Sequence, residues 1–122
     1  MATTALTEAE FGQTISENGI VFVDFWAEWC PPCKMFGPVF EAASETHPDA
    51  VFAKIDTDAE RELAGGLGIS SIPTLMAFRD GYLVYREAGA LNKSQFEKLV
   101  LQVKDLDMDK LKADAEAAKA TS

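Results

Sequence analysis

Two cysteines separated by two residues are the side chains in this sequence best suited to chemistry. Cys30 and Cys33 are the only cysteines of the 122-residue chain. They follow an apolar run at residues 20–26, which predicts a buried strand, and they open a stretch from 31 to about 46 that predicts a helix. A Cys-x-x-Cys pair at the start of a helix is typical of a redox-active dithiol, so the predicted chemistry is thiol–disulfide exchange.

The start of this helix predicts different roles for the two cysteines. With Cys30 as the N-cap, Pro31 and Pro32 occupy the first two helical positions, where proline is tolerated. Because Pro32 has no N–H, the backbone donor to the Cys30 sulfur should be Cys33, which brings the two sulfurs close together. The partial positive charge of the helix N-terminus stabilises a Cys30 thiolate. We therefore expect Cys30, at the exposed edge, to attack a disulfide, and the more buried Cys33 to resolve the mixed disulfide.

Two other interpretations of the cysteine pair are open at this point. A Cys-x-x-Cys pair can be half of a zinc site, but His47 is the only other strong candidate ligand, so a four-ligand site would need a dimer that bridges two chains. The two thiols could also be inert and buried. The neighbouring Trp29, Pro31 and Pro32 favour an exposed, rigid turn instead.

The elements that position the cysteines alternate between strands and helices. A second apolar strand is predicted at residues 51–55 and a helix at 58–67, so the middle of the chain reads strand–helix–strand–helix. This order implies parallel pairing through a right-handed crossover. The remaining predicted elements are a helix over residues 6–17 with a capping box at Thr7 and Glu10, strands at 74–78 and 82–87 joined by the turn Asp80-Gly81, and a helix that follows Asn92.

Length, composition and charge limit the function classes. The chain is long enough for one domain, which we place at residues 1–104, and residues 105–122 form an alanine-rich, charged extension that could be a loosely docked helix or a frayed tail. The formal net charge of -9 argues against nucleic acid and anionic membrane surfaces as partners. No run approaches the roughly 20 apolar residues of a membrane span. No basic and apolar leader is visible at the start, so we expect a cytoplasmic protein.

Several short motifs resemble those of the thioredoxin family. The segment at residues 24–30, followed by Pro32-Cys33-Lys34, is similar to the active-site segment of the family. Further similar segments are Gly68-Ile69, Ile72-Pro73-Thr74 around the family's cis-proline, the hairpin Gly81, and Gly89-Ala90-Leu91. The resemblance covers about residues 6–104. It implies an α/β protein with the thioredoxin fold, in which four helices flank a central, mixed, five-stranded sheet.

The resemblance also implies catalytic roles outside the cysteine pair. Asp24 resembles the family's buried carboxylate, which takes the proton of Cys33 directly or through water, and Lys54 resembles the lysine that pairs with this carboxylate. A carboxylate in an apolar strand should have a raised pKa, which suits a base that works near neutral pH. On the residues alone, a buried aspartate satisfied by hydrogen bonds is as good an interpretation of Asp24, and a solvated lysine is the alternative for Lys54.

A substrate surface is implied in front of the cysteines. Pro73 resembles the family's cis-proline, which faces the cysteines, and the backbone of Ile72 would pair with a bound substrate chain. On the residues alone, a trans proline at the start of a strand and scattered surface hydrophobics are the simpler interpretations. The residues implied to form this substrate surface are Trp29, Pro31, Pro32, Gly68, Ile69, Ile72, Pro73, Gly89 and Ala90.

The implied function is that of a protein-disulfide reductase. It would bind no cofactor and no metal, would use a redox-active Cys30–Cys33 disulfide, and would receive electrons from NADPH through a thioredoxin reductase. Its other partners would be proteins that contain disulfides, and we expect a monomer. The sequence departs from the family at Pro31, where glycine is usual, so the strength of the redox couple is an open question. The alternatives are an oxidant or isomerase with the same fold, and a binding module whose cysteines are incidental.

Overall fold

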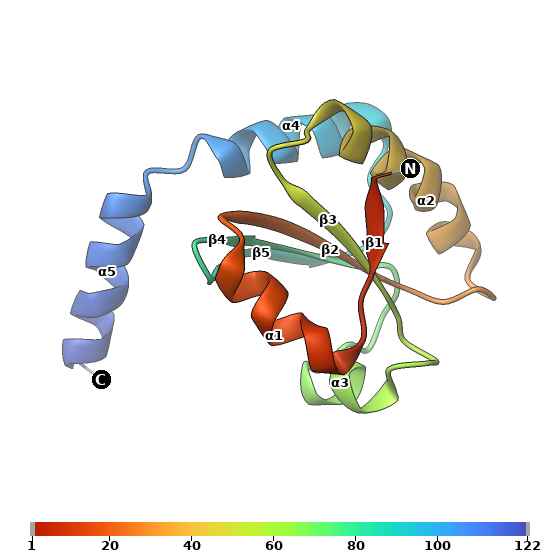
Figure 1. The fold of residues 1–122 in the computed structure, drawn as a ribbon, viewed down its shortest axis with the longest axis horizontal. Helices are drawn as coiled ribbons and strands as arrows, with labels where there is room; N and C mark the ends of the chain where they lie inside the picture. The colour runs from red at the N-terminus through yellow and green to blue at the C-terminus, as the bar shows by residue number, and fades with distance from the viewer. Residues whose placement is uncertain (1, 122) are drawn as a thin grey trace.

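The computed structural model describes residues 2–121, and in these residues it contains one five-stranded sheet (Figure 1). The strands are β1 (Thr3–Ala5), β2 (Ile20–Trp26), β3 (Val51–Asp56), β4 (Thr74–Arg79) and β5 (Tyr82–Ala88). Their order across the sheet is β1-β3-β2-β4-β5. β3 is parallel to both β1 and β2, whereas β4 is antiparallel to both β2 and β5. The predicted mixed sheet of five strands is confirmed.

β2 is the central strand and leads directly into the cysteines. Residues 21–25 are buried, which agrees with a strand that is apolar on both faces. Asp24 is in register with Lys54 of β3 on one side and with Leu75 of β4 on the other. The predicted parallel pairing of the two apolar strands is therefore confirmed, and it brings the two candidate catalytic residues outside the cysteine pair side by side.

Five helices accompany the sheet in the described residues, so the expectation of four is wrong. They are α1 (Glu8–Glu17), α2 (Pro31–Thr46), α3 (Arg61–Gly66), α4 (Lys93–Lys104) and α5 (Met108–Thr121). α2 has the predicted bounds, and α4 begins after Asn92, whose side chain accepts a hydrogen bond from the Gln95 backbone N–H at 2.8 Å. The helix that was not counted is α5.

α5 forms in the extension for which the sequence left two interpretations open. Its first turn is capped by Asp107, whose carboxylate accepts a hydrogen bond from the Lys110 N–H at 3.1 Å. Met108 is buried, and Lys112 forms an ion pair with Asp80 at 3.0 Å. The ion pair attaches α5 to the β4–β5 turn, at the edge of the molecule seen on the left in Figure 1. Most of the extension is therefore a helix that is loosely docked on the rest of the chain.

The first strand, β1, was not predicted from the pattern of apolar residues. β1 has only three residues, of which Thr3 is half-buried and the other two are exposed, so the alternation that identifies longer strands cannot develop. The pairing with β3 places β1 at the edge of the sheet. The next element, α1, begins two residues later than expected. Its predicted cap is present in part, because the Glu10 carboxylate accepts the Thr7 backbone N–H at 3.1 Å.

α3 is shorter than the helix predicted at residues 58–67. The carboxylate of Asp56 accepts hydrogen bonds from the backbone N–H groups of Asp58 and Ala59, at 2.9 and 3.3 Å. These bonds form a turn at the end of β3 in place of the first helical turn. The helix then runs from Arg61 to Gly66.

The sheet separates two apolar clusters. The cluster under α2 and α4 is built around phenylalanines: Phe22, Phe36, Phe40, Phe52 and Phe96, with ring centroids 5.1–6.2 Å apart in the pairs that contact. The cluster on the other face contains Val21, Val23, Phe25, Ile55 and Met76 and is covered in part by Phe11 of α1. Each buried side chain of this size contributes about 1.5–3 kcal/mol. The phenylalanine cluster thus fixes α2, which carries Cys33, on the sheet.

The C-terminal end of α2 is joined to α4 by a polar network. His47 Nε2 lies 2.7 Å from Glu97 Oε1, and His47 Nδ1 lies 2.6 Å from Lys104 Nζ. Lys104 also donates to Asp49 at 2.8 Å. An ammonium group can only donate, so Nδ1 accepts and Nε2 carries the hydrogen shared with Glu97. Both ring nitrogens of His47 are occupied, which leaves it no role as a metal ligand in this arrangement.

Candidate active site

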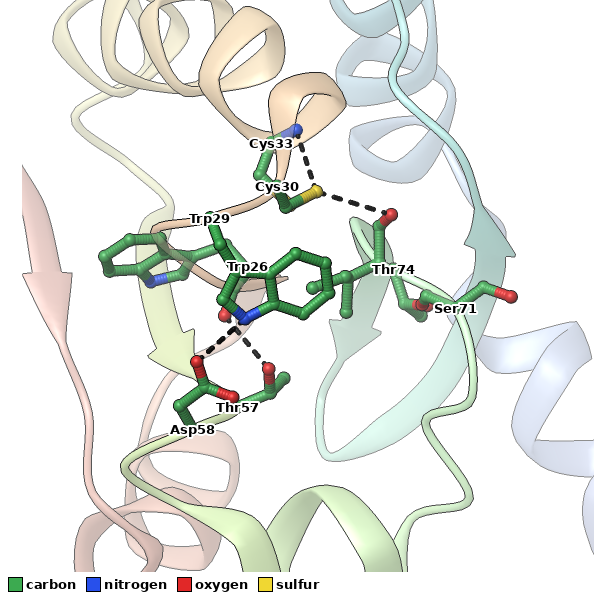
Figure 2. The surroundings of a disulfide bond; sticks show 9 residues. Trp26, Trp29, Cys30, Cys33, Thr57, Asp58, Ser71 and Thr74 are labelled. Atoms are coloured by element: carbon green, nitrogen blue, oxygen red, sulfur yellow. Dashed lines mark hydrogen bonds between the residues drawn. A yellow bond between two sulfur atoms is a disulfide. The ribbon is translucent and has the colours of Figure 1, made fainter.

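Cys30 and Cys33 form a disulfide at the N-terminus of α2 (Figure 2). Cys30 is the N-cap with extended backbone angles, Pro31 and Pro32 are the first two helical residues, and the Cα atoms of the two cysteines are 5.2 Å apart. The Cys33 backbone N–H points at the Cys30 sulfur, with a nitrogen–sulfur distance of 3.2 Å. The predicted cap is confirmed. This N–H and the partial positive charge of the helix N-terminus both stabilise negative charge on the Cys30 sulfur.

The expectation that Cys33 is the more buried cysteine is wrong. Cys30 is 2% exposed and Cys33 is 4% exposed, so exposure does not separate the two. In the disulfide each sulfur covers the other, and Ala27 and the half-buried side chains of Trp26 and Ile72 pack around both. The difference between the sulfurs lies instead in their surroundings, because the Cys30 sulfur has a helix N–H directed at it.

The segment around Pro73 lies against the cysteine turn. The Ile72 carbonyl oxygen is 3.7 Å from the Cys30 sulfur. The Ile72–Pro73 peptide bond is cis, as the resemblance implies. The carbonyl of Pro73 accepts the Gly89 backbone N–H at 2.8 Å, and this bond ties the end of β5 to the same segment. The chain thus brings Cys30, Ile72 and Gly89 together from three distant parts of the sequence.

Asp24 is fully buried in β2, and its environment raises its pKa. Neither carboxylate oxygen has a hydrogen-bond partner among the protein groups of residues 2–121. Burial disfavours the charged form and raises the pKa of Asp24 to about 7, while the positive charge of Lys54 acts in the opposite direction. A carboxyl group with this pKa can both hold and release a proton near neutral pH.

Lys54 lies between β3 and α2. It is half-buried, its Nζ lies 4.8 Å from the centre of the Trp26 ring, and the same group lies beside Gly37 of α2. A cation over an aromatic face is stabilised by the ring's electrons. Lys54 is therefore not simply a solvated strand lysine, and its charge is held close enough to Asp24 to oppose the rise in the pKa of that carboxyl group.

Trp29 is held in place by a residue that the sequence did not point to. Trp29 is 66% exposed, and its indole N–H donates to Asp58 at 2.9 Å (Figure 2). Thr57 also contacts the turn, because its hydroxyl donates to the Trp26 carbonyl oxygen at 3.2 Å. These partners are about 30 residues apart, and no local spacing pattern could have revealed the pairing. The loop after β3 therefore orients the aromatic side chain next to the cysteines.

The residues expected to form the substrate surface differ in their exposure. Gly68 and Gly89 have φ angles of +69° and +113°, which favour glycine. Ile69 is half-buried and packs against the apolar cluster on the face of the sheet that α1 covers in part, so only part of Ile69 reaches the surface. Pro73 is buried and Ile72 is half-buried. The exposed members are Trp29, Pro31, Pro32, Gly68, Gly89 and Ala90.

Metal-ligating side chains do not cluster in the part of the chain that the structure describes. Among residues 2–121 there is no group of three or more histidine, cysteine, aspartate or glutamate side chains that could hold a metal ion. The two cysteines are bonded to each other, and His47 belongs to the network with Glu97 and Lys104. The arrangement of this site therefore fits a redox disulfide.

Comparison with known proteins gives matches over most of the chain. The family model described as Thioredoxin matches residues 2–119. A Streptomyces coelicolor protein described as "Putative thioredoxin 2" is 51% identical over 111 residues, which cover 91% of this chain and 83% of that protein. The thioredoxin of Alicyclobacillus acidocaldarius is 44% identical over 84% of this chain and 98% of its own length. Among solved structures, Plasmodium falciparum thioredoxin superimposes with a TM-score of 0.76 at 38% identity, over 82% of this chain and 98% of that one.

Proposed function

The chain belongs to the thioredoxin family and is a thiol–disulfide oxidoreductase, and on this basis we propose that it reduces disulfides in other proteins. The observation that carries the proposal is the Cys30–Cys33 pair at the N-cap of α2, beside the backbone of Ile72. A dithiol in this position has a stabilised thiolate for attack and a second thiol within bonding distance for release.

In the proposed reaction the Cys30 thiolate attacks one sulfur of the substrate disulfide. A Cys30–substrate bond forms, the substrate disulfide breaks, and the first substrate sulfur leaves as a thiolate. Cys33 then loses its proton to Asp24, directly or through water, and its thiolate attacks Cys30. The Cys30–Cys33 disulfide forms, the second substrate sulfur leaves, and the substrate has gained two electrons. The pKa of Asp24 at about 7 supports its role as the base in the second step.

The oxidised protein must be reduced before it can act again. We propose that a thioredoxin reductase supplies the two electrons from NADPH, so that the protein itself needs no bound cofactor and contributes to cell redox homeostasis. Its other partners are proteins that contain disulfides, and it acts as a monomer in the cytoplasm, where thiols are kept reduced. No helix in residues 2–121 is both long enough and apolar enough to cross a membrane.

The residues proposed to receive the substrate are those of the expected surface around the disulfide. Residues 1–104 are proposed as the catalytic domain, and residues 105–122 as an appended segment. This division is supported by the few contacts that hold α5, among them the Lys112–Asp80 ion pair and the burial of Met108. The proposal assigns no catalytic role to α5.

Insulin reduction tests the proposed function. With a thioredoxin reductase and NADPH, the protein is expected to reduce insulin, measured as NADPH consumption and as precipitation of the insulin B chain. The Cys30→Ser/Cys33→Ser double variant should be inactive in the same assay. No turnover by the unaltered protein contradicts the reductase function. Activity that persists in the double variant would show that the two cysteines do not carry the reaction and are incidental, as in the alternative of a binding module.

An oxidant or isomerase is the second candidate function, because Pro31 occupies the first helical position between the cysteines. Pro31→Gly is expected to change the reduction potential and to leave the fold intact, since proline restricts the backbone of Cys30 and glycine frees it. The measurement is equilibration of both forms with glutathione buffers, and circular dichroism checks the fold. Equal potentials for the two proteins contradict the prediction, and a strongly oxidising potential of the unaltered protein favours the second candidate function.

A further inference from the structure

The loop that carries Ile72 and Pro73 is held by β5 at both of its ends. This loop comprises residues 67–73, between α3 and β4. At its second end, the Gly89 backbone N–H donates to the Pro73 carbonyl oxygen at 2.8 Å. At its first end, Nη2 of Arg86 donates to the Gly68 carbonyl oxygen at 3.0 Å. The attachment of Pro73 is a bond between two backbone groups. The attachment of Gly68 depends on the single side chain of Arg86.

Arg86 reaches Gly68 across the width of β4. It is in register with Met76, whose side chain belongs to the apolar cluster on the face opposite α2, so Arg86 leaves β5 on this same face. The backbone N–H groups of Gly68 and Ile69 already close the turn after α3, with bonds of 3.1 and 2.9 Å to α3 carbonyls. Arg86 adds a bond from the outer strand to the Gly68 carbonyl.

Ile69 and Ile72 of the loop pack against apolar clusters, whereas the two serines between them face an open hollow. Ser70 and Ser71 are exposed, and an open hollow bordered by both serines and Arg86 separates the loop from β5. The Thr74 hydroxyl donates to the Ser71 carbonyl oxygen, and this bond ties the loop to the start of β4 but not to β5. The Arg86 side chain therefore connects the Gly68 end of the loop to β5 across this hollow.

We propose that Arg86 is a positioning residue for protein substrates. By fixing Gly68, it holds the loop so that the backbone of Ile72 stays beside Cys30, where a bound polypeptide would pair with it. The Ile72 carbonyl oxygen is 3.7 Å from the Cys30 sulfur, so a small displacement of the loop changes the space that a substrate chain must enter. The inference rests on the proposed reduction of protein disulfides. Because Arg86 contacts neither sulfur in the structure, its effect falls on polypeptide binding and not on the chemical step.

The test compares a protein substrate with a small one. Arg86→Ala is expected to raise the KM for insulin about five-fold, the effect of losing one charge-assisted hydrogen bond at an exposed site, with kcat nearly unchanged. The rate with a small aromatic disulfide should not change, because this substrate is too short to use the loop. Arg86→Lys should restore most of the KM, since an ammonium group can donate one bond to the same carbonyl. Hydrogen exchange of amides 69–72 should be faster in Arg86→Ala only.

Lys98→Ala is the matched control, because it removes the same charge from an exposed position on α4. Its KM should equal that of the unaltered protein. An equal rise in both alanine variants, an unchanged KM in Arg86→Ala, or a parallel loss with both substrates each overturns the inference. If the unaltered protein does not reduce insulin, the proposed function fails. Hydrogen exchange of amides 69–72 then still decides whether Arg86 holds the loop. Unchanged exchange in Arg86→Ala overturns the inference that Arg86 holds it.

Discussion

Replacing Cys33 with serine is expected to trap a protein substrate on Cys30 as a stable mixed disulfide. The Cys30 thiolate remains stabilised by the helix N-terminus and can still attack, whereas a serine hydroxyl at position 33 cannot displace the substrate sulfur. Turnover should fall by about a thousand-fold or more in both the Cys33→Ser and the Cys30→Ser variants, as is usual when one member of a catalytic unit is removed. The trapped adduct is measured by non-reducing electrophoresis and intact-mass spectrometry after incubation with oxidised insulin.

The two single variants must behave differently for the proposed order of attack to hold. Cys30→Ser should be inactive and should not accumulate an adduct. The remaining Cys33 is not at the N-cap, so its thiolate is not stabilised as that of Cys30 is. The two cysteines are equally buried in the disulfide, so this contrast tests the helix N-terminus as the cause and not exposure. An adduct that forms on Cys33 in Cys30→Ser, with none in Cys33→Ser, would show that the order is reversed.

Replacing Asp24 with asparagine is expected to stabilise the oxidised protein at alkaline pH. The pKa of Asp24 rises from 3.8 to about 7 on folding, because burial disfavours the carboxylate. The folded state therefore holds a proton that the unfolded state has lost between these two values, and the free energy of unfolding decreases as the pH rises through this range. Above pH 7 the ionised carboxylate costs about 4 kcal/mol, at 1.4 kcal/mol for each unit of pKa. A buried amide has its own desolvation cost, so we expect a gain of about 2 kcal/mol at pH 8.

The pH dependence distinguishes this effect from a general improvement in packing. At pH 4 the carboxyl group is neutral in the folded protein, and Asp24→Asn should change the stability little. The measurement is urea unfolding of the oxidised protein at pH 4 and pH 8. Asp114→Asn, at an exposed position of α5, serves as the control. Its free energy of unfolding should stay within about 0.5 kcal/mol of that of the unaltered protein at both pH values. A gain of equal size at both pH values would argue against a buried charge as the cause.

The same substitution should slow catalysis. An amide cannot take the proton of Cys33, so insulin reduction at pH 7 is expected to fall by about ten-fold or more in Asp24→Asn. Greater stability together with lower activity is the signature of a charge that is retained for function. Unchanged turnover would remove Asp24 from the mechanism.

Much of the fold follows from local patterns in the sequence. The double-faced apolar strand at residues 20–26, the prolines that open α2, and the capping side chain of Asn92 each predict an element that the structure contains. β1 was not predicted, because a strand of three residues at the edge of the sheet is too short to show an alternating apolar pattern. α5 was left open between a loosely docked helix and a frayed tail, because the segment has few large apolar residues and the helix has a contact with the β4–β5 turn that no local pattern encodes.

The candidate site could be predicted only where its signals are local. The cap geometry of Cys30 follows from the residues at positions 30–33 alone. By contrast, the bond from Trp29 to Asp58 and the bond from Arg86 to Gly68 join side chains to partners about 30 and 18 residues away. The equal burial of the cysteines depends on the disulfide itself, which covers both sulfurs. Contacts of these kinds depend on tertiary packing, which a linear pattern does not encode.

The bond between Gly89 and Pro73 joins parts of the substrate side of the site that are synthesised after the cysteines. Cys30 and Cys33 leave the ribosome well before residues 72–89, and the strands β4 and β5 that complete the sheet are made after the helix that carries the cysteines. A nascent chain therefore has a dithiol before it has the surface that orients a substrate. The proposed surface for a polypeptide substrate is therefore complete only when β5 has paired with β4 and Gly89 has bonded to Pro73.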